Sequence, residues 1–193
     1  MTDSPPLILA SQSPYKHRLM ARLGIPFESR SPAIDETRCP KESPREMTRR
    51  LARQKAEAVA RQEPKAWVLA GDQTAADGDH TIGKPGTVER AVAQLQRLQG
   101  STHHLITSIA LRGPDGSLRL STSTYEMVMR PLSEAQIRDY IDEDQPLDCA
   151  GSIKIEAGGI RLFKATYGDD PTAIEGLPLT HVWTLLLDAG LVH

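Results

Sequence analysis

The chain has 193 residues and a mass of 21.2 kDa, with 39% hydrophobic and 25% charged residues, as in ordinary soluble globular proteins. This length predicts one domain over residues 1–193, or two closely packed lobes, with a core that needs no disulfides. A net charge of −2 argues against a protein that coats nucleic acid, and no apolar run approaches the roughly 20 residues that span a bilayer. The N-terminus lacks the basic segment of a signal peptide, so we expect a cytoplasmic protein with no nucleic-acid or membrane partner.

The cysteines and the distribution of charge indicate the state of the thiols and the kind of ligand to expect. Cys39 and Cys149 form no CxxC pair, which favours reduced thiols over a zinc site or a disulfide framework. Residues 1–70 hold 13 Lys and Arg against 8 Asp and Glu, whereas residues 71–193 hold 10 against 17. A basic first third favours a local site for a small anionic ligand over a surface for a long polyanion.

The first elements alternate between strand and helix. Residues 7–10 are an apolar run typical of a buried strand, and Ser13-Pro14 then caps a helix that runs to Gly24. A strand-like stretch follows over residues 25–31. The capping box at residues 43–46 opens a longer helix with apolar side chains at helical spacing.

The later elements include two hairpins. The expected elements are, in order, a strand over 67–70, a hairpin turn at 77–79, a helix over 88–98 capped by Thr87, paired strands over 105–111 and 118–129, a helix from 134 opened by a second capping box at residues 133–136, a strand over 160–163 and a helix near 180–187. Early alternation and later hairpins predict an α/β fold, with a mixed twisted sheet and flanking helices.

An anion site is one interpretation of the segment from Ser11 to Lys16. Its hydroxyls and the backbone N–H groups at a helix start favour anions, and Lys16 adds a positive charge. The spacing of a glycine-rich P-loop is absent. The alternative is a capped helix whose basic side chains are simply solvated.

Two acidic positions stand out. Asp72 directly follows the strand predicted over 67–70 and would project from the carboxyl edge of a sheet, where open α/β sheets bind ligands. A carboxylate there can act as a general base toward water or hold a metal, although a turn-forming aspartate fits as well. Glu36, beside Asp35, is the second candidate, with a solvated loop acid as its alternative.

Three lysines could neutralise a triphosphate together. Lys55 is expected on the basic face of its helix, and Lys84 sits within Gly83-Lys84-Pro85. With Lys16 they would supply point charges of the kind that bind phosphate. Each lysine taken alone is typical of a solvated surface charge.

Taken in order, the motifs resemble the Maf family over essentially the whole chain. They are Leu7-Ile8-Leu9-Ala10-Ser11-Gln12-Ser13-Pro14, Asp35-Glu36, Leu51-Ala52-Arg53-Gln54-Lys55-Ala56, Gly71-Asp72-Gln73, Gly83-Lys84-Pro85, Cys149-Ala150-Gly151-Ser152 and Gly176-Leu177-Pro178-Leu179. Each is weak alone, but their shared order is specific. The resemblance implies an elongated, two-lobed (ITPase-like) fold with a central cleft and a homodimer. It also implies a pyrophosphatase that converts a nucleoside triphosphate to its monophosphate and pyrophosphate.

Three positions are similar to the 7-methyl-GTP pyrophosphatase branch of that family. Tyr15 stands where this branch has an aromatic residue, Gln73 where the dTTP- and UTP-hydrolysing branch has threonine, and Glu156 where that branch has glutamine. An aromatic face attracts the cationic 7-methylguanine ring. The Glu156 carboxylate could accept hydrogen bonds from the guanine N1–H and amine.

The resemblance also implies roles for the remaining site residues. Asp72 would accept the proton of the attacking water, and Glu36 would help to hold a divalent cation, Mg²⁺ or Mn²⁺. The positions matching triphosphate ligands are Ser11, Lys16, Lys55 and Lys84. Two residues depart from the family pattern, because Lys16 replaces an arginine and Gly71 replaces a serine. The alternatives are a broader house-cleaning pyrophosphatase for dTTP, UTP or other modified nucleotides, and a non-catalytic nucleotide-binding regulator of septum formation.

Overall fold

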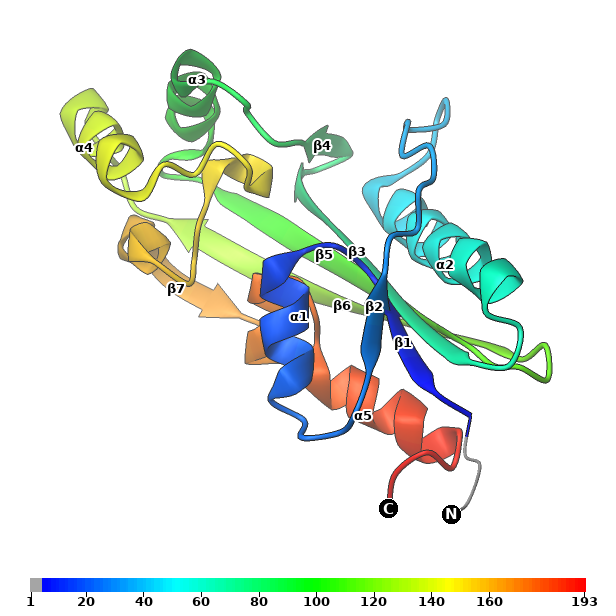
Figure 1. Cartoon of the computed structure of the whole chain (residues 1–193). Coiled ribbons are helices and arrows are strands. Elements are labelled where there is room, and N and C mark those ends of the chain that lie inside the picture. Colours follow the sequence, from blue (N-terminus) through cyan, green and yellow to red (C-terminus); the bar gives the residue numbers. More distant parts are fainter. Residues whose placement is uncertain (1–4) are drawn as a thin grey trace. The chain divides into compact units, whose positions relative to one another are not determined.

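A computed structural model describes residues 5–193, and in this range it has five α-helices and a seven-stranded sheet (Figure 1). The helices are α1 (Pro14–Ala21), α2 (Pro44–Gln62), α3 (Val88–Leu98), α4 (Glu134–Asp144) and α5 (Leu179–Asp188). The strands are β1 (Leu7–Ala10), β2 (Glu28–Arg30), β3 (Trp67–Asp77), β4 (His80–Ile82), β5 (Thr102–Arg112), β6 (Leu118–Met129) and β7 (Phe163–Tyr167). Among the described helices, none combines the length and apolar character needed to cross a membrane.

The sheet is mixed, which confirms the predicted α/β class. Its strand order is β2-β1-β3-β5-β6-β7, and β4 pairs with β3. Strand β1 runs parallel to β2 and β3, with Leu9 opposite Ser29 on one side and Leu69 on the other. Strands β4 and β7 run antiparallel to β3 and β6. The early strand–helix alternation therefore gives the parallel part, and the antiparallel part includes the β3–β4 hairpin and the pairing of β6 with β7.

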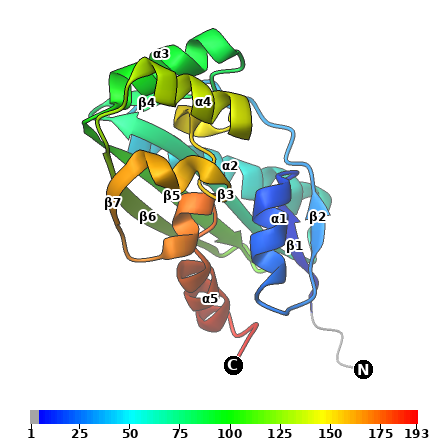
Figure 2. The same cartoon turned by 90° about the vertical axis from the view of Figure 1, so that its left-hand side faces the viewer.

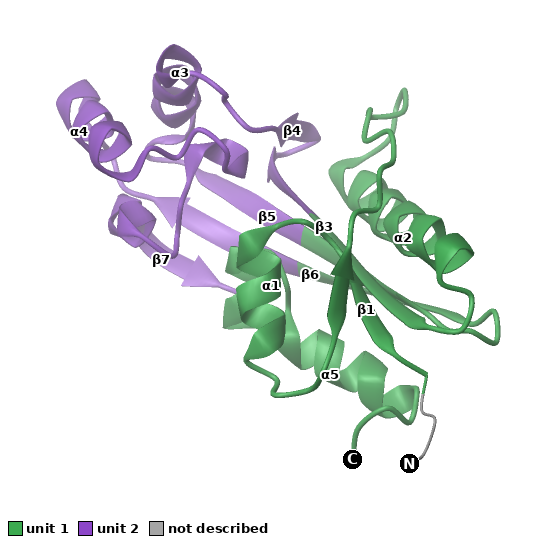
Figure 3. Ribbon diagram, viewed as in Figure 1, with its two compact units in different colours: residues 1–72, 107–123, 170–193 green, residues 73–106, 124–169 purple. Residues whose placement is uncertain are grey.

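The chain divides into two compact units (Figure 3). Unit 1 holds the chain up to Asp72 together with residues 107–123 and 170–193, and unit 2 holds residues 73–106 and 124–169. Strand β3 contributes to both, and the division falls between Asp72 and Gln73. The single domain over 1–193, the elongated shape and the central cleft stay predictions.

Unit 1 buries both faces of β1, as its continuous apolar run predicts. Leu7 and Leu9 belong to a hydrophobic cluster that includes residues of α1 and α5. Ile8 and Ala10 belong to a second cluster, which includes Ala52, Ala56 and Val59 of α2. Because successive side chains of a strand point to opposite faces, α1 with α5 and α2 cover opposite faces of β1 (Figure 1).

Unit 2 is built around the pair α3 and α4, which pack against each other (Figure 2). Thr87 caps α3, and the capping box predicted at Ser133 is present at the start of α4. Helix α3 also contacts the 3₁₀ helix Ala150–Ser152, and α4 contacts the 3₁₀ helix Gly158–Leu162. These contacts bring two sequence motifs, around Gly83 and Gly151, to one place in this unit.

The edge strand β2 is short and charged. All three of its residues are exposed. The guanidinium of Arg30 pairs with Glu28 at 2.6 Å and with Glu63 at 3.2 Å. Charged side chains of this kind make a sheet edge a poor partner for another strand.

Three predicted strands differ most from the structure. The stretch over 25–31 is a strand only at Glu28–Arg30, and Pro26 has no N–H to give to a ladder. The strand predicted over 160–163 is part of the 3₁₀ helix Gly158–Leu162, and β7 begins at Phe163. The strand predicted over 67–70 does not stop at Gly71 but continues to Asp77, because its second half pairs with β4.

Candidate active site

The centre of the candidate site is an ion-pair cluster in unit 1. Lys55 Nζ donates to Asp72 Oδ1 at 2.7 Å and lies 2.9 Å from Glu36 Oε1. The side chains of Asp72 and Lys55 are 8% and 11% exposed, whereas that of Glu36 is 57% exposed. One ammonium therefore links a buried carboxylate to one that faces solvent.

Asp72 lies inside β3, so the prediction that it follows the end of a strand was wrong. Its position still corresponds to a carboxyl edge, because its parallel neighbour β1 ends at Ala10 and the register pairs Leu9 with Leu69. Asp72 thus extends beyond the end of β1, where the loop to α1 begins. In β3 it shares a face with Val68 and Ala70, which belong to the cluster on the α2 side.

Lys55 is buried, so its predicted place on a basic, solvated helix face was wrong. It lies four residues after Leu51 and four before Val59, and both are buried. This spacing puts Lys55 in the apolar stripe of α2, a signal that the sequence already carried. A lysine in such a stripe needs a carboxylate partner, and Asp72 supplies it.

For both Asp72 and Lys55, burial and ion pairing shift the pKa in opposite directions. Burial raises the pKa of Asp72, and the nearby ammonium of Lys55 only partly opposes this. Burial alone would lower the pKa of Lys55, but its two carboxylate partners outweigh it, so the pKa of Lys55 is raised. A carboxylate with a raised pKa holds a proton more readily than a solvated one, as a general base requires.

The junction between β1 and α1 is built from serine hydroxyls. Ser13 caps α1 and accepts a hydrogen bond from the Lys16 backbone at 3.4 Å, which confirms the predicted cap. The backbone N–H of Ser13 donates to Ser11 Oγ at 3.1 Å. Lys16 Cε lies 3.5 Å from the point that a Cβ on Gly71 would occupy, and the Lys16 charge acts on Asp72. Ser11, Lys16 and the cluster around Asp72 thus share one end of unit 1.

Tyr15, on the first turn of α1, already carries a cation over its ring. The Arg18 guanidinium lies 5.5 Å from the ring centroid, which is within the range of a cation–π contact. Tyr15 is half-buried and Arg18 is exposed. The side chain predicted to stack on a cationic base is therefore in contact with a cation of the protein itself.

The remaining predicted residues belong to unit 2. Gln73 follows Asp72 in β3, and the alternation of a strand directs its side chain to the opposite face. Lys84 is exposed, next to a Gly83 carbonyl that accepts from Gly151 N at 3.2 Å and from Gln94 Nε2 at 3.2 Å. Gln94 was not singled out from the sequence, where nothing distinguishes it from other helix-surface glutamines.

Glu156 is exposed in a tight turn of unit 2. The Lys154 carbonyl accepts hydrogen bonds from Ala157 N at 3.1 Å and Gly159 N at 3.0 Å, and Lys154 N donates to Tyr140 Oη at 2.9 Å. A Cβ on Gly159 would lie 2.5 Å from the Lys154 carbonyl oxygen, so this turn requires glycine. The Tyr140 hydroxyl and Gly159 fix the backbone that carries Glu156, and both were missed in the sequence.

Metal ligands are limited within residues 5–193, where no group of three or more His, Cys, Asp or Glu side chains is arranged to hold a metal ion. Glu36 and Asp72 provide two carboxylates on one ammonium. Mg²⁺ is usually held by one or two carboxylates together with phosphates of a substrate and water, so the exposed carboxylate of Glu36 fits a cation that arrives with a phosphorylated ligand. Cys39 and Cys149 are free thiols, as predicted.

The fold and these residues define an α/β protein with a charged cluster at the carboxyl end of parallel strands. The family model for Maf-like proteins matches residues 6–189. The 7-methyl-GTP pyrophosphatase of Xanthomonas campestris pv. campestris (strain 8004) is 44% identical over 186 residues, covering 96% of this chain and 97% of its own. The protein of the same name from Pseudomonas aeruginosa is 42% identical over 187 residues, covering 96% and 97%. The chain therefore belongs to the Maf family.

Among solved structures, the Staphylococcus aureus Ham1 protein superposes with a TM-score of 0.47 at 17% identity. The superposition covers 64% of this chain and 71% of that protein.

Proposed function

We propose that this protein is a nucleoside triphosphate pyrophosphatase that hydrolyses 7-methyl-GTP to 7-methyl-GMP and pyrophosphate. Relatives that bear the name 7-methyl-GTP pyrophosphatase match nearly the full length of the chain. The observation that carries the proposal is the buried Asp72–Lys55 pair with Glu36 on the same ammonium. This cluster would supply a proton acceptor and a cation-binding acid next to a serine-lined helix start.

Asp72 is the proposed general base. It would take a proton from a water molecule as the water oxygen adds to the α-phosphorus, and the bond from that phosphorus to the bridging oxygen would break. Pyrophosphate leaves with the electrons of that bond. The raised pKa of Asp72, caused by burial, supports this role, and Lys55 would keep its carboxylate in a fixed orientation.

Phosphate binding is assigned to Ser11, Lys16 and Lys84, with Lys55 in support. Ser11 and Lys16 lie at the start of α1, where backbone N–H groups and the helix dipole favour anions. Lys55 already binds two carboxylates, so its charge acts on the phosphates partly through Asp72 and Glu36. Electrostatic stabilisation of this kind is the main contribution of a protein to phosphoryl transfer.

Glu36 would help to hold a divalent cation, Mg²⁺ or Mn²⁺, together with the phosphates of the substrate. When bound, such an ion neutralises charge that develops on the leaving pyrophosphate. Glu36 suits the role because its carboxylate is exposed while Lys55 restrains it. We also propose that the protein is cytoplasmic and works as a homodimer, as its family resemblance suggests.

Base recognition is assigned to Tyr15 and Glu156, with Gln73 as a further contributor. The contact between Arg18 and Tyr15 supports the affinity of this ring for a cation, which 7-methylguanine would provide. A carboxylate at Glu156 would accept two hydrogen bonds from guanine, one more than a pyrimidine can offer there.

A substrate screen with purified protein tests the proposal. Pyrophosphate release would be measured for 7-methyl-GTP, GTP, dTTP and UTP, with Mg²⁺ or Mn²⁺ present and absent. We expect 7-methyl-GTP to be the preferred substrate and Asp72→Asn to abolish turnover while the melting curve stays cooperative. A tenfold or greater preference for dTTP or UTP would favour a broader pyrophosphatase instead. Nucleotide binding without any pyrophosphate release would favour a non-catalytic regulator.

A further inference from the structure

Glu36 lies in a long loop without regular secondary structure. The loop connects β2, which ends at Arg30, to α2, which begins at Pro44. Ala33 and Lys41 have positive φ angles of 38° and 64°, a region that side chains other than glycine rarely adopt. A segment with such a backbone needs external contacts to keep one conformation.

Apolar packing contributes little to holding this loop. An open pocket of about 360 Å³ lies between part of it and α2, and its lining residues are Ile34, Asp35, Gln54, Glu57 and Arg61. The ion pair of Glu36 with Lys55 also cannot fix the loop alone. Glu36 is 57% exposed, so solvent screens its side of the ion pair.

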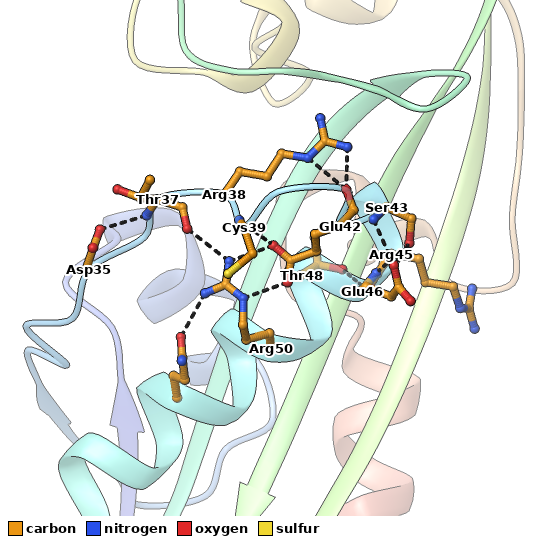
Figure 4. A network of polar contacts seen from close by, with 11 residues as sticks. Asp35, Thr37, Arg38, Cys39, Glu42, Ser43, Arg45, Glu46, Thr48 and Arg50 are labelled. Atoms are coloured by element: carbon orange, nitrogen blue, oxygen red, sulfur yellow. Dashed lines mark hydrogen bonds and ion pairs between the residues drawn. The ribbon is translucent and has the colours of Figure 1, made fainter.

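Arg50, on α2, binds the loop at two points (Figure 4). Its Nε and Nη2 atoms donate to the two carboxylate oxygens of Glu42 at 2.6 and 2.8 Å, a bidentate pair. Nη2 also donates to the carbonyl oxygen of Thr37 at 3.1 Å. Nη1 donates to Gln54 Oε1 at 3.0 Å, one turn further along the helix, which fixes the orientation of the guanidinium.

Glu42 connects Arg50 to residues in the middle of the loop. The Cys39 backbone N–H donates to Glu42 Oε2 at 3.1 Å, and Arg38 Nε donates to the Glu42 carbonyl at 2.9 Å (Figure 4). The side chains of Arg50 and Glu42 are 18% and 9% exposed, so solvent screens this pair less than it screens Glu36 and Lys55. The anchor of the loop is therefore Arg50 with Glu42, and Thr37 brings that anchor within one residue of Glu36.

We infer that Arg50 is a positioning residue, which holds the loop on α2 so that the Glu36 carboxylate stays against Lys55. The inference rests on the proposed function for the role of Glu36 in catalysis, but the placement of Glu36 by Arg50 can be measured without any substrate. All three guanidinium nitrogens of Arg50 donate to the loop or to Gln54, which suits a positioning role.

The test compares Arg50→Gln with wild type and with Arg53→Gln in the full-length protein. Arg53 is a matched control because it lies on the same helix, is 50% exposed and pairs only distantly with Glu57, at 3.8 Å. Two measurements need no substrate: the NMR Overhauser contact between the side chains of Glu36 and Lys55, and hydrogen exchange of the Thr37 and Cys39 amides. We expect Arg50→Gln to lose the contact and to speed exchange at both amides, and Arg53→Gln to change neither.

Kinetics then show whether Arg50 acts through Glu36. We expect Arg50→Gln to lower kcat for 7-methyl-GTP roughly 10- to 100-fold, and the Arg50→Gln/Glu36→Gln double variant to be no slower than Glu36→Gln alone. Arg50→Lys should recover part of the loss, since it keeps the charge without the bidentate geometry. A kcat in the double variant that is lowered by the product of the two single losses would overturn the inference.

Retention of the Glu36–Lys55 contact in Arg50→Gln would also overturn it, whatever the kinetics. If Arg50→Gln does not fold, Glu42→Ala removes the bidentate partner of Arg50 from the loop side and is judged by the same two NMR measurements. A wild-type protein that releases no pyrophosphate from any triphosphate would refute the proposed function, while these NMR measurements would still decide the role of Arg50.

Discussion

Lys55 Nζ lies 2.7 Å from Asp72 Oδ1, and both side chains lie between α2 and β3, shielded from solvent. Removing the lysine would leave a buried carboxylate without its counter-charge. We expect Lys55→Met to lower the free energy of unfolding by roughly 3–5 kcal/mol at pH 7, measured by urea denaturation.

Two further variants make this prediction specific to the pair. Adding Asp72→Asn to Lys55→Met removes the unpaired charge and should restore much of the lost stability. Lys65→Met, at an exposed position, should change stability by less than about 0.5 kcal/mol. A small effect of Lys55→Met would show that Asp72 needs no counter-charge in the folded protein.

Arg18 competes with a cationic base for the ring of Tyr15. Replacing Arg18 with glutamine removes both this contact and a repulsive charge. We expect KM for 7-methyl-GTP to fall roughly two- to fivefold in Arg18→Gln, with little change for GTP, in line with an exposed cation–π contact. Arg22→Gln, on an exposed side chain of the same helix end with only a 3.9 Å ion pair to Glu175, is the control. Equal changes for both nucleotides would argue against stacking on Tyr15.

Two glycines provide a matched comparison of close approach. A Cβ on Gly159 would lie 2.5 Å from the Lys154 carbonyl oxygen, whereas a Cβ on Gly71 would meet only side-chain atoms at 3.5 Å, an ordinary contact distance. We expect Gly159→Ala to cost roughly 1–3 kcal/mol and to weaken the preference for 7-methyl-GTP, because it displaces the turn that carries Glu156.

Gly71→Ala should be neutral or should stabilise the protein by up to about 1 kcal/mol, because alanine restricts the unfolded chain more than glycine does. Thermal unfolding of both variants and their 7-methyl-GTP to GTP rate ratios would check the pair of expectations. A cost of Gly159→Ala as small as that of Gly71→Ala would mean that the close approach at Gly159 is relieved by movement of the turn.

His103 gives the stability of the protein a pH dependence. Its ring is fully buried, and within the described chain neither ring nitrogen has a hydrogen-bond partner. Burial, aided by the nearby charge of His104, lowers the pKa of His103 to about 4. The unfolded chain therefore binds a proton at His103 between about pH 6.5 and pH 4 that the folded protein does not, so stability falls as the pH drops through this window.

A shift of this size corresponds to about 3 kcal/mol. We expect His103→Leu to flatten the fall in stability between pH 6.5 and pH 4, measured by urea denaturation at several pH values. His104→Leu should flatten it less, because the charge of His104 is a smaller cause of the shift than burial. A profile that keeps its slope in His103→Leu would assign the pH dependence to other groups.

Much of the fold could be predicted because local signals and tertiary packing agree. Both capping boxes, the Thr87 cap, the Ser13-Pro14 helix start and the turn at Gly78 appear where the sequence places them. The strand over 67–70 was cut short because Gly71 and Asp72 are typical of a loop. Pairing with β4 outweighs that local preference and extends β3 to Asp77.

The candidate site was harder to predict than the fold. The individual residues were identifiable from motifs, but the burial of Lys55 required its helical spacing to be weighed against its charge. Contacts between loops leave no periodic pattern, so the hydrogen bonds of Arg50 to Glu42 and Thr37 could not be inferred. The same holds for the Tyr140 hydroxyl and the backbone N–H of Lys154.

The charged strand β2 has a consequence for how copies of this chain can meet. One outer edge of the sheet is β2, where Arg30 is tied to Glu28 and Glu63, and the other is β7, which ends at the exposed Tyr167. A second chain that added a strand at β2 would have to break these ion pairs and desolvate their charges. Addition of a strand at the β2 edge is therefore disfavoured, so this edge resists aggregation by strand pairing.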